Sequence, residues 1–184
     1  MEKLRNRIDT AIQIAVGLDD VTEELMNTHS PVIDTERLDA IHVSGDYIYL
    51  GANIAMKSGM AELIGKIMHE ARHVVVHKFL SKWQDIVEEF SGDRVKKLPC
   101  DMLCGNGLPD WDLMFKVFNI AGDAVINNDM RHVPVIRDSN GIQFGRYPLS
   151  QLPPRSCEIA TFHILINDDQ IRGEVMEYIK KGMK

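Results

Sequence analysis

The chain has 184 residues, of which 45% are hydrophobic and 26% are charged, a composition typical of a globular protein with a buried core. Lys and Arg number 21 against 27 Asp and Glu, so the formal net charge is −6, and no concentrated basic run could follow a phosphate backbone. Nucleic acid is therefore not an expected partner. No apolar stretch approaches the ~20 residues of a membrane-spanning helix, so no membrane partner is expected either.

The chain start and the cysteines favour a cytoplasmic protein. Charged residues lie within the first ten positions and no long apolar core follows, which predicts a helix and not a signal peptide. Cys100, Cys104 and Cys157 are an odd number, as expected for reduced thiols in a cytosol. Cys100 and Cys104 could begin a zinc clip, but no histidine pair lies beside them, so we interpret the cysteines as small hydrophobic residues.

The first half of the chain predicts helices around a small sheet. Residues 2–28 have apolar spacing of helical period, interrupted at Gly17, which indicates one or two helices. The segment 41–51 alternates apolar and aromatic residues around Ser-Gly-Asp, a pattern typical of a β-hairpin. From residue 58 to about residue 83, apolar residues recur at steps of three and four, which predicts one long helix.

The second half is predicted to be helical as well. A turn-rich connector covers residues 91–109, and a helix follows from Asp110, a suitable N-cap, to about Asp129. A loop with Gly141 and Gly145 leads to a last amphipathic helix near residues 157–181. We therefore expect a single domain over 1–184 of the α+β class, mainly helical, with one small sheet before the 58–83 helix.

Residues 69–73 have the sequence His-Glu-Ala-Arg-His, an HExxH motif inside the 58–83 helix. Two histidines at positions i and i+4 share one helix face and can both bind one metal ion, while the intervening glutamate can take a proton from a metal-bound water. The motif predicts His69 and His73 as metal ligands and Glu70 as the catalytic base. Two solvated helix histidines are the alternative.

His77 continues the four-residue spacing, but a straight helix places its backbone about 12 Å along the axis from that of His69. A single ion with bonds of about 2.0–2.1 Å cannot reach all three histidines unless the helix breaks. The pair His69 and His73 is preferred because Glu70 follows His69. We expect His77 to support the ligands or to serve as an ordinary core or surface histidine.

A third ligand is expected on the helix that follows Asp110. Asn119, Asp123 and Asn127 form a polar stripe among apolar residues, and a carboxylate there would be costly to bury unless it were paired or bound to metal. Asp123 is the predicted third ligand, with Asn119 and Asn127 as supporting residues, and a solvated stripe is the alternative. Two histidines, one carboxylate and an open position suit one Zn²⁺ ion best.

The segment 35–79, TERLDAIHVSGDYIYLGANIAMKSGMAELIGKIMHEARHVVVHKF, followed by FNIAGDAVINNDM at 118–130, resembles a metallopeptidase domain family of bacteria and phages. Members often precede a von Willebrand factor A-like domain. They carry a Thr-led strand hairpin, a helix with HExxHxxxH and a later helix with N-x-A-x-D-x-x-x-N. SCEIATFHIL at 156–165 loosely resembles a short helix near the end of that domain. The resemblance implies a zincin-like fold with His69, His73 and Asp123 on zinc and Glu70 as general base.

These features predict a zinc-dependent peptidase, a hydrolase whose partner is a protein or peptide substrate. The sequence does not identify the hydrogen-bond donor that would stabilise the tetrahedral oxyanion. The candidates are Tyr147, His132, His163 and Arg146. One alternative is a non-enzymatic binding or regulatory protein with a structural or vestigial site. Another is hydrolysis of a non-peptide amide. Glu70 favours an enzyme, because a structural zinc site needs no base.

Overall fold

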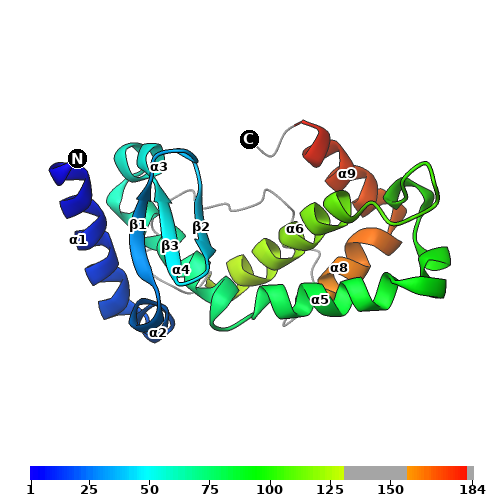
Figure 1. The fold of residues 1–184 in the computed structure, drawn as a ribbon, viewed down its shortest axis with the longest axis horizontal. Coiled ribbons are helices and arrows are strands. Elements are labelled where there is room, and N and C mark those ends of the chain that lie inside the picture. Colours follow the sequence, from blue (N-terminus) through cyan, green and yellow to red (C-terminus); the bar gives the residue numbers. More distant parts are fainter. Residues whose placement is uncertain (131–156, 182–184) are drawn as a thin grey trace. The chain divides into compact units, whose positions relative to one another are not determined.

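The computed structural model describes residues 1–130 and 157–181, apart from the side chains of residues 93 and 94. This part of the chain is mainly helical and contains a three-stranded sheet, which confirms the α+β, mainly helical class (Figure 1). The chain divides into two compact units. The first holds Met1–Lys78 and the end of one helix from Asp129, and the second begins at Phe79. The single domain expected over 1–184 stays a prediction.

The first unit begins with two helices, α1 (Glu2–Leu18) and α2 (Asp20–Thr28). The break falls at Asp19, two residues after the predicted interruption at Gly17, where the backbone is extended. The Asp19 side chain accepts a hydrogen bond from the Thr22 N–H at 3.2 Å and so caps α2. A carboxylate at this position satisfies one of the open amide donors of the first helical turn.

The sheet of the first unit contains β1 (Ser30–Asp34), β2 (Ile41–Ser44) and β3 (Tyr47–Gly51). The strand order is β1-β3-β2, with β3 parallel to β1 and antiparallel to β2. Gly45 begins the two-residue turn between β2 and β3 with a φ of 58°, a conformation that suits glycine. The predicted hairpin is confirmed, whereas β1 was not predicted.

Two further helices, α3 (Ala52–Lys57) and α4 (Met60–Val74), complete the first unit. Helix α4 contacts α1, α2 and β2. Its apolar face recurs at helical spacing, and this periodicity buries one side of the helix in the unit's core. The buried residues of α4 are Leu63, Ile64, Gly65, Ile67, Met68, His69 and Ala71.

The predicted helix over 58–83 is wrong in extent, because the chain turns between α4 and α5 (Phe79–Phe90). The His77 N–H donates at 2.9 Å to the carbonyl of Arg72, five residues back, whereas in a regular α-helix each N–H donates to the carbonyl four residues back. Lys78 then adopts a φ of 46°, in the left-handed region. The helix therefore breaks at the position where a straight helix was assumed for His77.

The second unit is built from helices. They are α5, the short 3-10 helices η1 (Gly92–Lys97) and η2 (Cys100–Met102), α6 (Trp111–Met130), α8 (Glu158–Asn167) and α9 (Asp169–Lys180). Helix α6 matches its prediction, and the Leu113 N–H donates to the Asp110 carboxylate at its start. The core of the unit joins residues of these helices, including Ile86, Phe90, Met102, Met114, Phe118, Phe162 and Leu165.

The last predicted helix, near 157–181, is two helices in the structure. Asp168 lies between α8 and α9, and its side chain accepts a hydrogen bond from the Ile171 N–H at 3.0 Å. A capping carboxylate of this kind starts a new helix, as Asp19 does in the first unit. The predicted loop with Gly141 and Gly145 lies outside the described residues. Within residues 1–130 and 157–181, every helix is too short or too polar to cross a membrane.

Candidate metal centre

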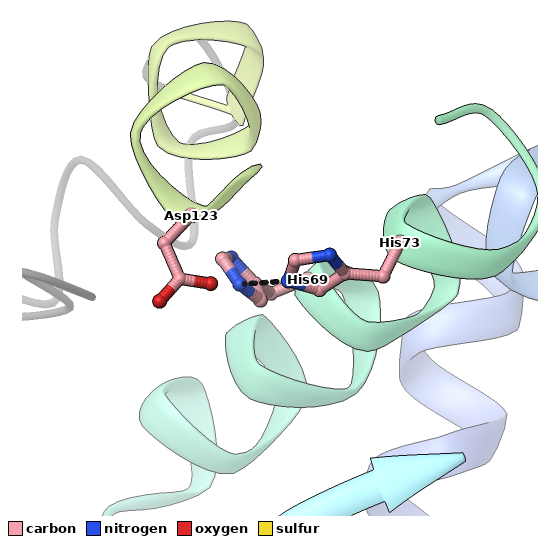
Figure 2. Close-up of side chains that lie close together, drawn as sticks. All are labelled: His69, His73 and Asp123. Atoms are coloured by element: carbon pink, nitrogen blue, oxygen red, sulfur yellow. Dashed lines mark hydrogen bonds between the residues drawn. The ribbon is translucent and has the colours of Figure 1, made fainter. Parts of the chain in front are cut away.

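Helix α4 brings the two motif histidines together. His69 and His73 lie one turn apart, with their Nε2 atoms 3.0 Å from each other and their ring centroids 4.8 Å apart. His69 is almost fully buried, with 2% of its surface exposed, and His73 is half-buried. The predicted sharing of one helix face is thus present in the structure (Figure 2).

The facing Nε2 atoms define what this pair can bind. A hydrogen bond between the two nitrogens requires that one ring carry a proton on Nε2 and donate it to the other ring. When both Nε2 atoms are deprotonated, both lone pairs are available to bind a metal ion. Bonds of about 2.0–2.1 Å in a tetrahedral zinc site set two nitrogens about 3.3 Å apart. The observed 3.0 Å needs only a small widening, so the pair fits a zinc ion.

Asp123 supplies a carboxylate to the same group. Its side chain is half-buried on α6, where the neighbouring residues Ala121, Gly122 and Ala124 are buried. One ligand atom from each of His69, His73 and Asp123 lies within 4.8 Å of the others, and Figure 2 shows the carboxylate directed toward the imidazole rings. Two nitrogens and one oxygen form a donor set that leaves a position open on a tetrahedral metal.

Glu70 follows His69 on α4 and is half-buried. Because successive helical side chains are about 100° apart, Glu70 stands beside the histidine face and not on it. This placement suits a carboxylate that acts on a water and does not ligate a metal. Its role as a base stays a prediction.

Arg72, the residue just before the second histidine of the motif, anchors α4. Its guanidinium donates to both carboxylate oxygens of Asp19, at 2.8 and 2.9 Å, and also to the Met68 carbonyl. Burial opposes ionisation of Asp19, but hydrogen bonds from Arg72 and Thr22 outweigh it and lower the pKa of that carboxyl. The bidentate pair fixes the rotation of α4, and with it the face that carries the histidines.

His77 is turned inward by the break after α4. It is buried, with 6% of its surface exposed, and its Nε2 lies 3.2 Å from the Asp129 Oδ2 at the end of α6. His77 was excluded as a ligand only for an unbroken helix, and α4 ends at Val74, before His77. Sequence reasoning missed Asp129 as its partner, because no periodicity links a residue in a turn to the end of a later helix.

Of the remaining predicted site residues, some belong to the described part of the chain and others lie outside it. Asn119 and Asn127 lie one turn before and one turn after Asp123 on α6, and both are half-buried. His163, a candidate oxyanion donor, has its Nε2 3.0 Å from the Glu89 Oε2 in the second unit. The other three candidates, His132, Arg146 and Tyr147, lie outside the described residues.

The cysteines do not behave as small buried residues, which corrects that interpretation. Cys100, Cys104 and Cys157 are free thiols and all are exposed. Cys157 precedes α8, and its sulfur accepts a hydrogen bond from the Ala160 N–H at 3.4 Å. The Cys157 side chain thus caps the start of α8 while its thiol stays exposed.

Comparison with known proteins gives no match: no family model, no curated protein and no solved structure is similar to the chain at a significant level. The resemblance to the metallopeptidase family therefore stays a prediction that rests on the quoted residues.

Proposed function

We propose that the chain is a zinc-dependent peptidase with a zincin-like site. The observation that supports it most strongly is the Nε2 pair of His69 and His73, 3.0 Å apart on one helix, with Glu70 between them. The Asp123 carboxylate completes the proposed ligand set. This combination resembles catalytic zinc sites, which use three protein ligands and leave one position for water, more than structural sites, which close all four positions.

In this proposal each residue of the site has one task. Bound zinc would supply a Lewis acid that lowers the pKa of water and polarises the scissile carbonyl. His69, His73 and Asp123 hold that ion and leave one side open. Glu70 accepts a proton from the attacking water and passes it to the leaving amine. His69 is 2% exposed, so this ligand is shielded from bulk water, whereas His73 and Asp123 are half-buried.

The edge strand β2 offers a place for an extended substrate. β2 contacts α4, the helix of the histidines, and pairs with β3 on one side. The two-residue turn makes Ser44 and Tyr47 a hydrogen-bonded pair, so the alternation of an antiparallel ladder turns the backbone groups of Ile41 and Val43 away from β3. A peptide could add to this edge as a further strand.

The proposal is tested by comparing metal content and peptide cleavage in wild type and a Glu70→Gln variant. The variant should keep one equivalent of zinc, because glutamine leaves all three ligands intact. It should lose cleavage by about 10²-fold or more, because a positioned base contributes on that order. His73→Ala should lose both zinc and cleavage. Peptide mixtures analysed by mass spectrometry give the cleavage readout.

Other outcomes separate the rival functions. Equal cleavage by wild type and Glu70→Gln would rule out this mechanism. Zinc binding without cleavage of any peptide would favour a binding or regulatory protein that retains the site. Release of amines from small amide substrates, with no cleavage of peptides, would favour a non-peptide amidohydrolase.

A further inference from the structure

The turn between α4 and α5 holds a buried histidine with a strained neighbour. Lys78 has a φ of 46°, a left-handed conformation that a side chain with a Cβ adopts at a cost. The neighbours of His77 are exposed, Val76 at 50%, whereas His77 itself is 6% exposed. Strain of this kind persists only where surrounding contacts impose it. The contacts that hold His77 inside are therefore candidates for a specific role.

Asp129 provides one such contact. Its Oδ2 lies 3.2 Å from the His77 Nε2, and both residues belong to the first unit. The Asp129 side chain is 46% exposed and the His77 side chain 8% exposed. The His77 backbone is fixed as well, since its N–H donates to the Arg72 carbonyl at 2.9 Å. The pair therefore joins the end of α6 to a turn whose own geometry is set by α4.

This connection bears on Asp123, because α6 is one continuous helix from Trp111 to Met130. Asp123 precedes Asp129 by six residues, about 9 Å along the helix axis. On the other side, His73 precedes His77 by only four residues. Holding Asp129 against His77 thus restricts where the Asp123 carboxylate can lie relative to the histidine pair.

We propose that His77 and Asp129 are positioning residues, which act as a clamp on the end of α6 and hold Asp123 in reach of the metal bound by His69 and His73. The inference rests on the proposed zinc site and adds to it the device that brings the third ligand into place. His77 is not itself a ligand in this scheme. The role differs from a general contribution to folding, because its effect on zinc passes through Asp123.

The test measures zinc affinity by competition with a chromophoric chelator. Asp129→Asn keeps the size of the side chain and removes its charge, and His77→Gln removes the imidazole. Each should weaken zinc binding by about 10- to 100-fold, the usual effect of losing a residue that orients a ligand. Asp112→Asn is the matched control at the opposite end of α6, where the side chain is 80% exposed, and should leave the affinity unchanged.

The decisive comparison repeats Asp129→Asn in an Asp123→Ala background. If the clamp acts through Asp123, the second substitution causes no further loss of zinc affinity, whereas a loss of the same size in both backgrounds would overturn the inference. Unchanged zinc affinity in Asp129→Asn and His77→Gln would also overturn it and leave the proposed function standing. Complete loss of zinc in His77→Gln alone would make His77 a ligand and overturn the positioning role.

The melting temperature of each variant without metal provides a readout that does not depend on zinc. The clamp predicts that zinc affinity falls in Asp129→Asn while the metal-free protein melts within a few degrees of wild type. No zinc binding by wild type would overturn the proposed function first, and the clamp with it.

Discussion

At the scale of single residues, Arg72 shows that the intervening positions of the HExxH motif are not neutral. Arg72 and Asp19 side chains are 13% and 8% exposed, so their ion pair is largely removed from water. The same carboxylate receives the Thr22 N–H and hydroxyl and so caps α2. Asp19 therefore caps the start of α2 and also anchors α4, the helix that carries the histidines.

Replacing Arg72 with methionine should lower the free energy of unfolding by about 3 kcal/mol at pH 7, because it leaves a buried carboxylate without its cation. Chemical denaturation measures this change. Lys116→Met is the matched control. It breaks an exposed pair with Asp112, and the free energy should change by no more than about 0.5 kcal/mol. A similar small loss for Arg72→Met would show that the pair contributes little.

The same pair has a defined pH dependence. The pKa of Asp19 is lowered in the folded protein, so its stabilisation is present above the unfolded pKa of about 4 and is lost as pH falls through the lowered value. In Arg72→Met that lowering is removed. The difference in unfolding free energy between the two proteins should therefore narrow below about pH 4, and a constant difference down to pH 2 would contradict this account.

At the scale of elements, Gly51 sets how β3 passes into α3. A Cβ at this position would lie 2.6 Å from the carbonyl oxygens of Arg37 and Ala40, and it would also meet the Leu38 carbonyl. Backbone atoms cannot move aside as a flexible side chain can. The close approach of the preceding loop is thus possible only for glycine, and it packs that loop against the junction of β3 and α3.

Gly51→Ala should cost about 1–3 kcal/mol of unfolding free energy, the usual penalty for overpacking. Gly17→Ala in α1 is the control, since a Cβ there meets nothing within 4 Å. It should leave stability unchanged or raise it by up to about 1 kcal/mol, because alanine is the better helix former. Thermal melts of both variants under one condition measure the contrast, and equal effects would refute the steric argument.

The break between α4 and α5 illustrates the limit of periodicity. Apolar residues continue at helical steps through 58–83, so the pattern alone predicts one helix. Val74, Val75 and Val76 are a β-branched run, which lowers helix propensity by only a few tenths of a kcal/mol per residue. This signal is too weak to locate a break. His77 contacts Asp129, a residue of a helix that is distant in the sequence. Apolar periodicity carries no information about such a contact.

At the scale of the whole molecule, the chain divides into two compact units. Most of α6 belongs to the second unit, and its residues from Asp129 belong to the first. The proposed ligands lie on α4 and α6, which are far apart in the sequence. A metal that binds the folded chain and not the unfolded one stabilises the folded state by mass action.

Zinc should therefore raise the melting temperature of the metal-free protein. At a zinc concentration of 100 times the dissociation constant the stabilisation is about 2.7 kcal/mol. Differential scanning fluorimetry with and without zinc measures it, and a chelator should reverse it. Asp123→Ala should lose most of the shift and Asp112→Asn should keep it. An equal shift in Asp123→Ala would show that the carboxylate is not a ligand.

The sequence by itself determined those turns and helices that have strong local causes. It also determined the motif on α4. The Ser-Gly-Asp hairpin, the helix after Asp110 and the shared face of His69 and His73 follow from turn chemistry, capping and helix period, which act over a few residues. The apolar neighbours of Asp123 also marked it as a carboxylate in need of a partner.

Only the tertiary structure decided where helices break and which distant residues meet. The parallel pairing of β1 with β3 passes over the intervening strand β2. The Arg72 and Asp19 pair and the approach of Asp129 to His77 join segments separated by long stretches of chain. Such contacts depend on packing free energy summed over whole elements, and this sum can outweigh the small local preferences that a sequence pattern records.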